Sequence, residues 1–235
     1  MSRITIVIPV WNNRGALVRC LRSIELQTFQ DVAIIVVDDG GVPPLHDGFQ
    51  IPDSRFQIQL VRQEHAGAPA ARNCGARETE SELIMFCDAD IELAPNALER
   101  MVATLDTYPE ASYAYSGFRF GWKLFRSFPF DADRLRRMPY IHTTSLIRRA
   151  HFPGFDESLI RFQDWDLWLT MLEHDHSGVH IPEVLFTIQN TRGTMSRWIP
   201  SLMHRLPWRS RRVREYDAAA EIVQRKHQLP GRLTG

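Results

Sequence analysis

Short apolar runs alternate with helical periodicities along the first 110 residues. Three apolar runs predict strands at residues 4–9, 32–37 and 83–87, and a weakly alternating segment predicts a further strand at 56–61. Apolar residues spaced three and four apart predict helices around residues 17–24 and after Pro95, and an Ala- and Arg-rich segment after the Gly67 turn predicts a helix over 68–80. Strands and helices that alternate at these spacings are typical of βαβ units. The fold class expected is therefore α/β, with a mainly parallel sheet.

The alternation weakens in the second half of the chain. An aromatic and basic stretch without a clear period is followed by a short amphipathic helix, by one or two strands broken at Pro182, and by a last helix, at residues 118–130, 164–173, 179–188 and 215–227. The sequence contains no internal repeat and no low-complexity tract. The βαβ pattern therefore accounts for the first half only.

Composition indicates a globular protein with an uneven charge distribution. Of the 235 residues 44% are hydrophobic, and 28 basic residues balance 28 acidic ones, which excludes wholesale disorder and argues against a nucleic-acid binder. The balance is a cancellation: residues 1–191 hold 18 basic and 25 acidic residues, and residues 192–235 hold 10 and 3. An acidic body therefore carries a basic tail.

Cysteine usage and hydropathy bear on the compartment. The 3 cysteines form no CxxC pair, so neither a disulfide framework nor a zinc site is expected, and a reducing compartment fits. The first residues show no signal peptide, and the apolar runs are far shorter than the ~20 residues of a membrane span. We expect a cytoplasmic protein, at most peripheral at the inner face of the membrane.

Polar residues follow directly after the predicted strands. In open α/β sheets ligands bind at the carboxyl ends of strands, so these residues are expected on one rim. Asp88 and Asp90 follow the fourth strand and can hold Mg²⁺ or Mn²⁺ together with substrate phosphates, or one of them a ribose hydroxyl. The alternative is a solvated acidic turn.

Other polar residues near this rim suit a nucleotide. Asp38 and Asp39 can accept from a base or ribose, and Trp11 can stack on a base. Arg72, in the helix after the Gly67 turn, can reach a diphosphate or base. The alternatives are turn or capping acids, a core tryptophan and a surface arginine.

Two acids stand among aromatic residues in the second half. Asp164 and Asp166 lie in the segment Phe-Gln-Asp-Trp-Asp. A carboxylate that is partly desolvated has a raised pKa and can act as a general base. Capping of the helix N-terminus is the equally supported alternative.

Six segments taken together resemble the successive motifs of family 2 glycosyltransferases. They occur in the family's order over roughly residues 3–197, at residues 8–13, 36–40, 67–73, 88–90, 154–157 and 163–168. The resemblance implies a GT-A fold, in which a Rossmann-like nucleotide-binding sheet with helices on both faces is fused to an acceptor-binding half. It implies one domain over residues 1–197, with a nucleotide-sugar half (1–110), an acceptor and catalytic half (111–197), and a basic helical tail (198–235).

The resemblance also implies a role for each motif residue. Pro9, Val10 and Trp11 would line the base site. Asp38 and Asp39 would bind the base, and Arg72 would lie near the base or diphosphate. Asp88 would bind the ribose and assist Asp90, the ligand of Mn²⁺ or Mg²⁺, while Asp164 would be the catalytic base. The residues to which the resemblance assigns a role are therefore Pro9, Val10, Trp11, Asp38, Asp39, Arg72, Asp88, Asp90 and Asp164.

The implied reaction is the inverting, metal-dependent transfer of one sugar from a nucleotide-diphosphate sugar, a UDP-sugar first of all, to a carbohydrate or lipid-linked acceptor. Such transfer serves the synthesis of polysaccharides, glycolipids or other glycoconjugates. The competing interpretations are a sugar nucleotidyltransferase and a catalytically silent binding module. A nucleotidyltransferase would need a Gly-rich triphosphate loop after the first strand, which this sequence lacks. The intact Asp88, Asp90 and Asp164 argue against a silent binding module.

Several positions depart from the family pattern. Trp11 replaces a tyrosine, and Gln163 replaces the glutamate of a Glu-Asp pair. Residues 189–193 resemble the Gln-x-x-Arg-Trp of processive synthases, but Gly193 replaces the tryptophan. Residues 192–196 look more like a late loop that closes over the donor diphosphate, without the metal-binding histidine of some relatives.

The basic tail allows two interpretations. Trp198 and Trp208 flanked by arginines suit a peripheral contact with anionic lipid, and hence a lipid-linked acceptor. The alternative is a basic helix that packs on the acidic body.

Overall fold

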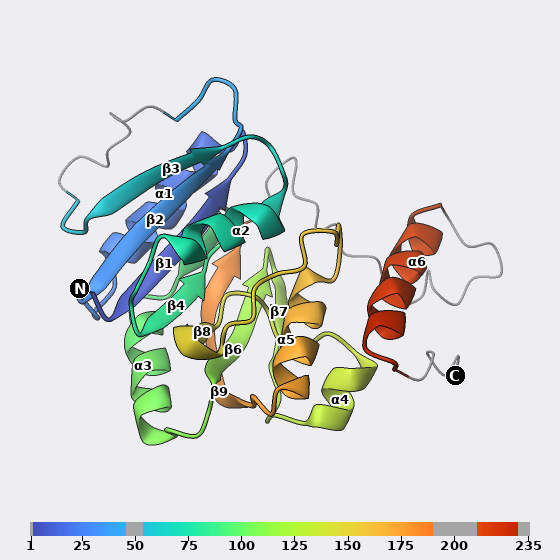
Figure 1. Cartoon of the computed structure of the whole chain (residues 1–235). Coiled ribbons are helices and arrows are strands. Elements are labelled where there is room, and N and C mark those ends of the chain that lie inside the picture. The colour runs from blue at the N-terminus through green and yellow to red at the C-terminus, as the bar shows by residue number, and fades with distance from the viewer. Residues whose placement is uncertain (1, 46–53, 190–210, 230–235) are drawn as a thin grey trace.

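A computed structural model describes residues 2–45, 54–189 and 211–229. Strands and helices alternate along the first part and become irregular later (Figure 1). In chain order the elements are β1 (Ile4–Val10), α1 (Arg14–Glu25), β2 (Val32–Asp39), β3 (Ile58–Gln63), α2 (Ala68–Arg77), β4 (Leu83–Phe86), β5 (Ile91–Leu93), α3 (Ala97–Thr107), β6 (Tyr113–Phe120), β7 (Lys123–Phe125), α4 (Ala132–Arg137), β8 (Leu146–Arg148), the 3₁₀ turn η1 (Arg149–His151), α5 (Gln163–Glu173), β9 (Gly178–Ile188) and α6 (Arg211–Lys226).

The strands form one nine-stranded sheet in the order β3-β2-β1-β4-β8-β6-β9-β5, with β7 paired to β6. The first four strands of this order are parallel, as the βαβ pattern predicts. In contrast, β8 runs antiparallel to both β4 and β6, and β5 runs antiparallel to β9. The long pairing of β6 with β9 is parallel again, so the expectation of a mainly parallel sheet holds for the longer pairings, and the antiparallel pairings of the second half are short.

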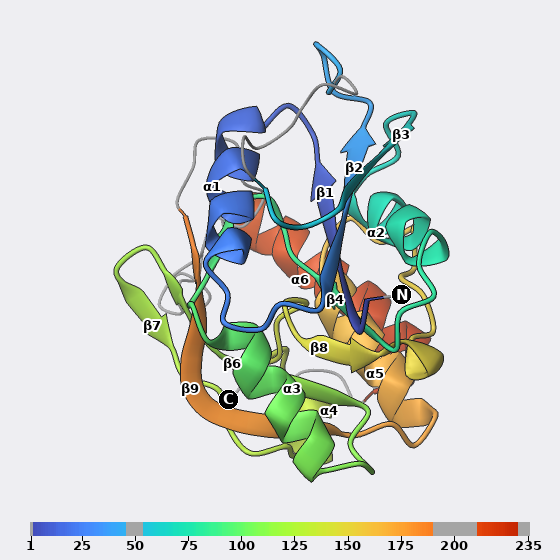
Figure 2. The ribbon, with the colours of Figure 1, turned by 90° about the vertical axis from the view of Figure 1, so that its left-hand side faces the viewer.

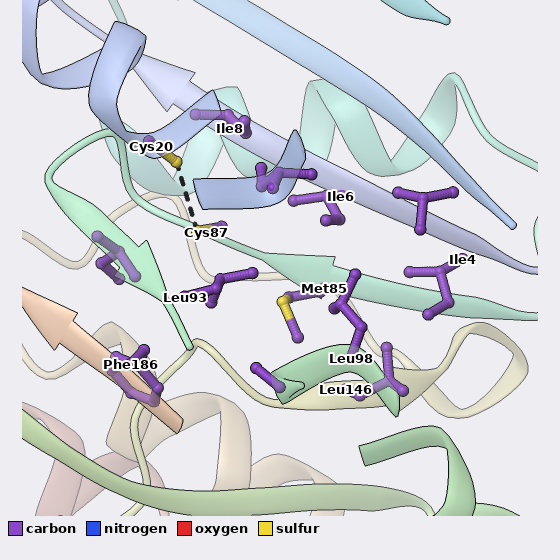
Figure 3. Close-up of a cluster of buried hydrophobic side chains, with 14 of the residues drawn as sticks. Ile4, Ile6, Ile8, Cys20, Met85, Cys87, Leu93, Leu98, Leu146 and Phe186 are labelled. Carbon is purple, nitrogen blue, oxygen red and sulfur yellow. Dashed lines mark hydrogen bonds between the residues drawn. The ribbon is translucent and has the colours of Figure 1, made fainter. Parts of the chain in front are cut away.

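Helices cover both faces of the sheet because the central strands are apolar on both. Ile4, Ile6 and Ile8 of β1 face one cluster, which contains residues of α1 and α3. Val7 faces the other, which contains residues of α2, α5 and α6. Figure 2 shows α1 and α2 on opposite sides of β1 and β2. Figure 3 shows the first cluster, where the thiols of Cys20 and Cys87 meet at 3.7 Å.

The second half contains elements that the periodicity did not predict. Residues 118–130 include part of the hairpin of β6 and β7, which turns through Gly121 with a φ of +55°. Residues 178–188 form one strand rather than two, because a bulge accommodates Pro182. Ser116 pairs with Ile181 and the next residue of β6 pairs with Val184, so the proline, which lacks an N–H, is left out of the ladder.

The described part of the basic tail is a helix that packs on the body. Val213, Ala220 and Val223 of α6 are buried, the last two in the cluster with residues of α5. This arrangement is that of the packing alternative. Among the described residues, no helix is long and apolar enough to cross a bilayer.

Candidate active site

The polar residues that follow strands do gather on one rim. The parallel register of β1 and β2 sets Val10 beside Asp38, and Cys87, just after β4, donates its N–H to the carbonyl oxygen of Val7. Pro9 and Val10 are buried strand residues. Trp11, directly after them, is 54% exposed and is therefore not a core residue. The sheet thus presents Trp11 at the edge where ligands bind in such folds.

Trp11 lies against the ring of His65. The two ring centroids are 4.6 Å apart and the planes are inclined by 18°. The Nδ1 atom of His65 lies 2.9 Å from a carboxylate oxygen of Asp39 and 3.1 Å from the Asp39 carbonyl oxygen. One imidazole is thus both stacked and hydrogen-bonded at the rim.

Asp39 is fully occupied by the loop before α2. Its carboxylate accepts from the Gln63 side chain at 2.8 Å and from the backbone N–H groups of Ala66 and Gly67 at 2.9 and 3.0 Å. With His65 as the fourth neighbour, the usual acceptor positions of a carboxylate are filled. Asp39 therefore shapes this loop in the structure described.

Asp38 organises the turn after β2. Its buried carboxylate accepts from the N–H groups of Gly41 and Leu45 and pairs with Arg62. A Cβ on Gly41 would lie only 2.8 Å from this carboxylate, so the turn requires a glycine there. These contacts are those expected of an acid that stabilises a turn, which is the alternative interpretation of Asp38.

Arg72 connects the two halves of the chain. It is only 5% exposed, so it is not a surface arginine. Its Nη2 donates to Asp88 at 2.6 Å and its Nη1 donates to the Gln163 side-chain oxygen at 2.9 Å. Helix α2 can bring Arg72 here because Gly75 packs on β1, where a Cβ would lie 2.4 Å from Val7. The residue before Asp164 is thereby tied to the acids after β4.

Asp88 and Asp90 differ in their electrostatics. Burial alone would raise the pKa of Asp88, but Arg72 and the charge of His142 outweigh it and hold that pKa below its ordinary value. Burial and the neighbouring Asp88 charge raise the pKa of Asp90 to about 6. Asp90 is therefore the acid with uncompensated charge.

This uncompensated charge fits a divalent cation. Within the described ranges no cluster of three or more His, Cys, Asp or Glu side chains could hold a metal alone. A magnesium-type ion needs only one or two carboxylates when substrate phosphates and water complete its shell. Asp90 and Asp88 meet that requirement.

Asp164 lies in the first turn of α5. Its carboxylate accepts from the N–H of Trp165 at 2.8 Å. Burial raises its pKa, against the charges of His142 and Arg72. Both interpretations of Asp164, as a capping acid and as a general base, are compatible with this position. Its carboxylate accepts from an N–H group of the first helical turn, and its burial favours the protonation behaviour of a general base.

His142 faces the same charges and carries no signal in the sequence. Its ring lies 5.2 Å from each of the rings of Phe118 and Phe186, and its Nδ1 accepts from the N–H of Thr144 at 3.1 Å. The neutral ring must then carry its proton on Nε2. Burial lowers the pKa of His142, against the charges of Asp88 and Asp164.

The segment 154–157 is docked on α2. Asn73 exchanges two hydrogen bonds with the backbone of Phe155, at 2.9 and 2.8 Å, and donates to Glu157 at 2.9 Å. Asn73 therefore holds this loop beside Arg72. The expected diphosphate loop at 192–196, Trp198 and Trp208 lie outside the described residues.

Comparison with known proteins places the chain in a family. Residues 5–167 match the family described as Glycosyl transferase family 2. The uncharacterized glycosyltransferase YwdF of Bacillus subtilis is 29% identical over 184 residues, which cover 71% of this chain and 67% of YwdF. Alignments with other curated relatives span a smaller part of their length, from 16% for GlyA of Streptococcus pneumoniae to 43% for the validoxylamine A glucosyltransferase of Streptomyces hygroscopicus.

Solved structures share the fold. Residues 1–349 of S. aureus TarS, in complex with UDP-GlcNAc, superpose with a TM-score of 0.70 at 15% identity, over 96% of this chain and 73% of that one. The mannosyltransferase PcManGT of Pyrobaculum calidifontis, in complex with GDP-Man and Mn²⁺, gives 0.61 at 20% identity, over 82% and 58%. The expected GT-A fold is confirmed, and the chain belongs to glycosyl transferase family 2.

Proposed function

We propose that the chain transfers one sugar, with inversion, from a nucleoside-diphosphate sugar to an acceptor hydroxyl. The observation that carries this proposal is the Arg72 bridge, which joins Asp88 of the nucleotide half to Gln163, the neighbour of Asp164. Asp88, the proposed donor-binding acid, and Gln163, the residue before the desolvated Asp164, thus share one buried cation. That arrangement suits a reaction in which a leaving group and a nucleophile meet.

The base site of this proposal is centred on Trp11. His65 already makes the two kinds of contact that a nucleobase would make there, a ring stack on Trp11 and a polar contact to Asp39. Since the acceptor positions of Asp39 are filled, a base with an imide N–H binds Asp39 when His65 leaves. The side chain of His65 is half-exposed and lies outside the hydrophobic clusters of the core, so its displacement would leave these clusters intact.

A UDP-sugar is the first choice of donor because uracil offers one imide N–H and a flat ring. The complexes of TarS with UDP-GlcNAc and of PcManGT with GDP-Man support a nucleotide sugar in general. The acceptor belongs to the other half of the chain and is a carbohydrate or a lipid-linked sugar.

The chain's own residues divide the chemistry. Asp164 removes the proton of the acceptor hydroxyl, which attacks the anomeric carbon from the face opposite the leaving group. Arg72 orients Asp88 and Gln163, and His142 offers an N–H donor near both acids. Asp90, with Asp88, would hold a divalent cation, which supplies neutralisation of the charge on the departing diphosphate.

A ligand panel tests this function. The melting temperature of the purified protein is measured with nucleotides and nucleotide sugars, with and without Mn²⁺. In a separate assay, release of the nucleotide from each nucleotide sugar is measured with water as acceptor. A ligand at 100 times its Kd stabilises the fold by about 2.7 kcal/mol. Binding with hydrolysis supports the proposal. Tight binding without hydrolysis of any donor favours the silent module, and no binding at all refutes both.

A further inference from the structure

The end of α6 contacts the helix that carries Asp164. Lys226 lies 2.8 Å from Asp166 and 2.7 Å from Asp156, measured from its ammonium nitrogen to carboxylate oxygens. His227 bridges two turns of α5: its Nε2 lies 2.8 Å from Asp166 and its Nδ1 lies 2.8 Å from Glu173. Two basic residues of the tail thus hold α5 at both ends of one face.

Asp164 and Asp166 serve opposite sides of α5. Residues two apart are rotated by about 200° around a helix axis. Asp166, 3% exposed, points to Lys226 and His227, whereas Asp164 feels the charges of His142 and Arg72. The placement of α5 against α6 therefore sets where Asp164 lies.

The start of α5 is strained and leans on α6. Phe162, directly before Gln163, has a φ of +59°, a left-handed conformation that is costly for an aromatic residue. Its ring packs edge-on against Tyr216 of α6, with centroids 4.7 Å apart. A strained residue persists where its surroundings fix it, and here α6 supplies part of that surrounding.

Lys226 also completes a path to Arg72. It holds Asp156, whose pKa this hydrogen bond and that from Ser158 lower to about 2. The neighbouring Phe155 is held in turn by Asn73 of α2. The loop 154–157 is thus fixed from both sides, by α6 and by the helix of Arg72.

We propose that Lys226 and His227 are positioning residues, which hold the first turn of α5 so that Asp164 stays in register with Arg72 and Asp88. The proposal rests on the proposed role of Asp164. Buried ion pairs contribute little net stability compared with apolar packing, and geometry is their better attested use. The pair of Asp166 and Lys226 also matches the helix dipoles, because Asp166 lies in the first turn of α5 and Lys226 in the last turn of α6.

Lys226→Met is the test variant, and the chain offers a matched control and a rescue. Arg225, the preceding residue of α6, is 82% exposed and pairs only at the surface with Glu221 among described residues, so Arg225→Met removes an equivalent charge without touching α5. Lys226→Arg restores a cation that can reach both acids. The readouts are kcat and KM for hydrolysis of the nucleotide sugar, and amide hydrogen exchange over residues 160–168.

The proposal expects a fall in kcat without a change in donor binding. In Lys226→Met, kcat should drop about tenfold, since small misplacements of catalytic groups are costly, with KM within about twofold. Exchange over residues 160–168 should accelerate. Lys226→Arg should recover most of kcat, and Arg225→Met should match the wild type. Wild-type kcat and exchange in Lys226→Met overturn the proposal, and so does an equal loss in Arg225→Met.

Glu173→Gln serves if Lys226→Met does not fold. Glu173 is 54% exposed and its change removes one of the two carboxylates that hold His227. We expect a drop in kcat of about threefold with KM unchanged, and faster exchange at the start of α5. Wild-type values for both refute the proposal. Should the wild type hydrolyse no nucleotide sugar, the proposed function fails, while the exchange data still decide whether α6 holds this turn.

Discussion

The imidazole of His65 lies on the indole of Trp11, with 4.6 Å between the ring centroids, and its Nδ1 reaches the Asp39 carboxylate at 2.9 Å. One side chain of the protein therefore fills the stacking and hydrogen-bonding position proposed for the donor base. If the base binds there, as we propose, the donor has to displace His65. The donor affinity is accordingly the difference between two similar sets of contacts.

His65→Ala is expected to tighten nucleotide binding. In the wild type the base has to replace the stack of His65 on Trp11, a contact worth about 1 kcal/mol. The variant has no such contact to lose. The Kd for UDP measured by titration calorimetry should fall by roughly fivefold. Trp11→Ala is the matched change on the other ring and should weaken binding, because base stacking is worth about 1–3 kcal/mol. Weaker binding of UDP by His65→Ala would show that His65 lines the site instead.

Asp164→Asn is expected to separate binding from transfer. The amide keeps the shape of the side chain but accepts no proton, so turnover should fall by ~10²-fold or more while the donor Kd stays constant. Asp133→Asn, at a 75% exposed acid of α4, is the control and should keep full turnover. Turnover at the wild-type rate in Asp164→Asn would remove the base assignment.

The pH profile of turnover follows from the same carboxylate. Burial raises the pKa of Asp164 above its ordinary value of 3.8, and a base must be deprotonated to act. Turnover at saturating donor should therefore rise with pH along an acid limb above pH 3.8, and this limb should be absent from the residual activity of Asp164→Asn. An unshifted limb in that variant would assign the titration to another group.

Asp90→Asn is expected to stabilise the fold while it removes metal-dependent binding. The pKa of Asp90 rises from 3.8 to about 6 on folding, so its charge costs stability once the pH exceeds 3.8, and in full above about 6. In urea denaturation at pH 7 with EDTA, the variant should be more stable by about 1–2 kcal/mol, less than the full shift because Asp90 is partly exposed to solvent. Glu92→Gln, two residues on, should show no gain. Loss of stability in Asp90→Asn would contradict the assignment of uncompensated charge.

His227 should make the stability of the protein fall at alkaline pH. Burial lowers its pKa, but hydrogen bonds to Asp166 and Glu173 outweigh burial and raise the pKa above 6.5. A raised pKa gives stability that is complete below 6.5 and is lost as the pH rises through the folded-state value. Denaturation of His227→Gln from pH 6 to 9 should lack this decline, whereas the exposed His174→Gln should retain it.

Most of the first half of the fold could be predicted because β1, β2 and β4 are buried on both faces and consist of almost unbroken apolar runs. The runs near residues 4, 32 and 83 became β1, β2 and β4 with their carboxyl ends together. The three-residue strand β8 is too short to show a period. The hairpin of β6 and β7 mixes aromatic and basic residues on both faces, so neither was recognisable.

The site divides in the same way. The acids were visible because they follow strands within a few residues. Their partners were not, because Arg72 meets Gln163 across 91 positions and His227 meets Asp166 across 61. His65 lies just before the segment 67–73, which was recognised. Its stack on Trp11 could not be predicted, because the two residues are far apart in sequence and only the fold brings them together.

The separation of Arg72 and Gln163 along the chain has a consequence for how the protein matures. Contacts between distant positions form after local ones, because closing a long loop costs entropy before any contact repays it. In a growing chain, Gln163 is synthesised 91 positions after Arg72, and Lys226 is synthesised 70 positions after Asp156, so both contacts have to wait for the second half of the chain. During synthesis the strands β1 to β4 can therefore pair before the site is complete, and we expect catalytic activity to appear only after α6 has packed on α5.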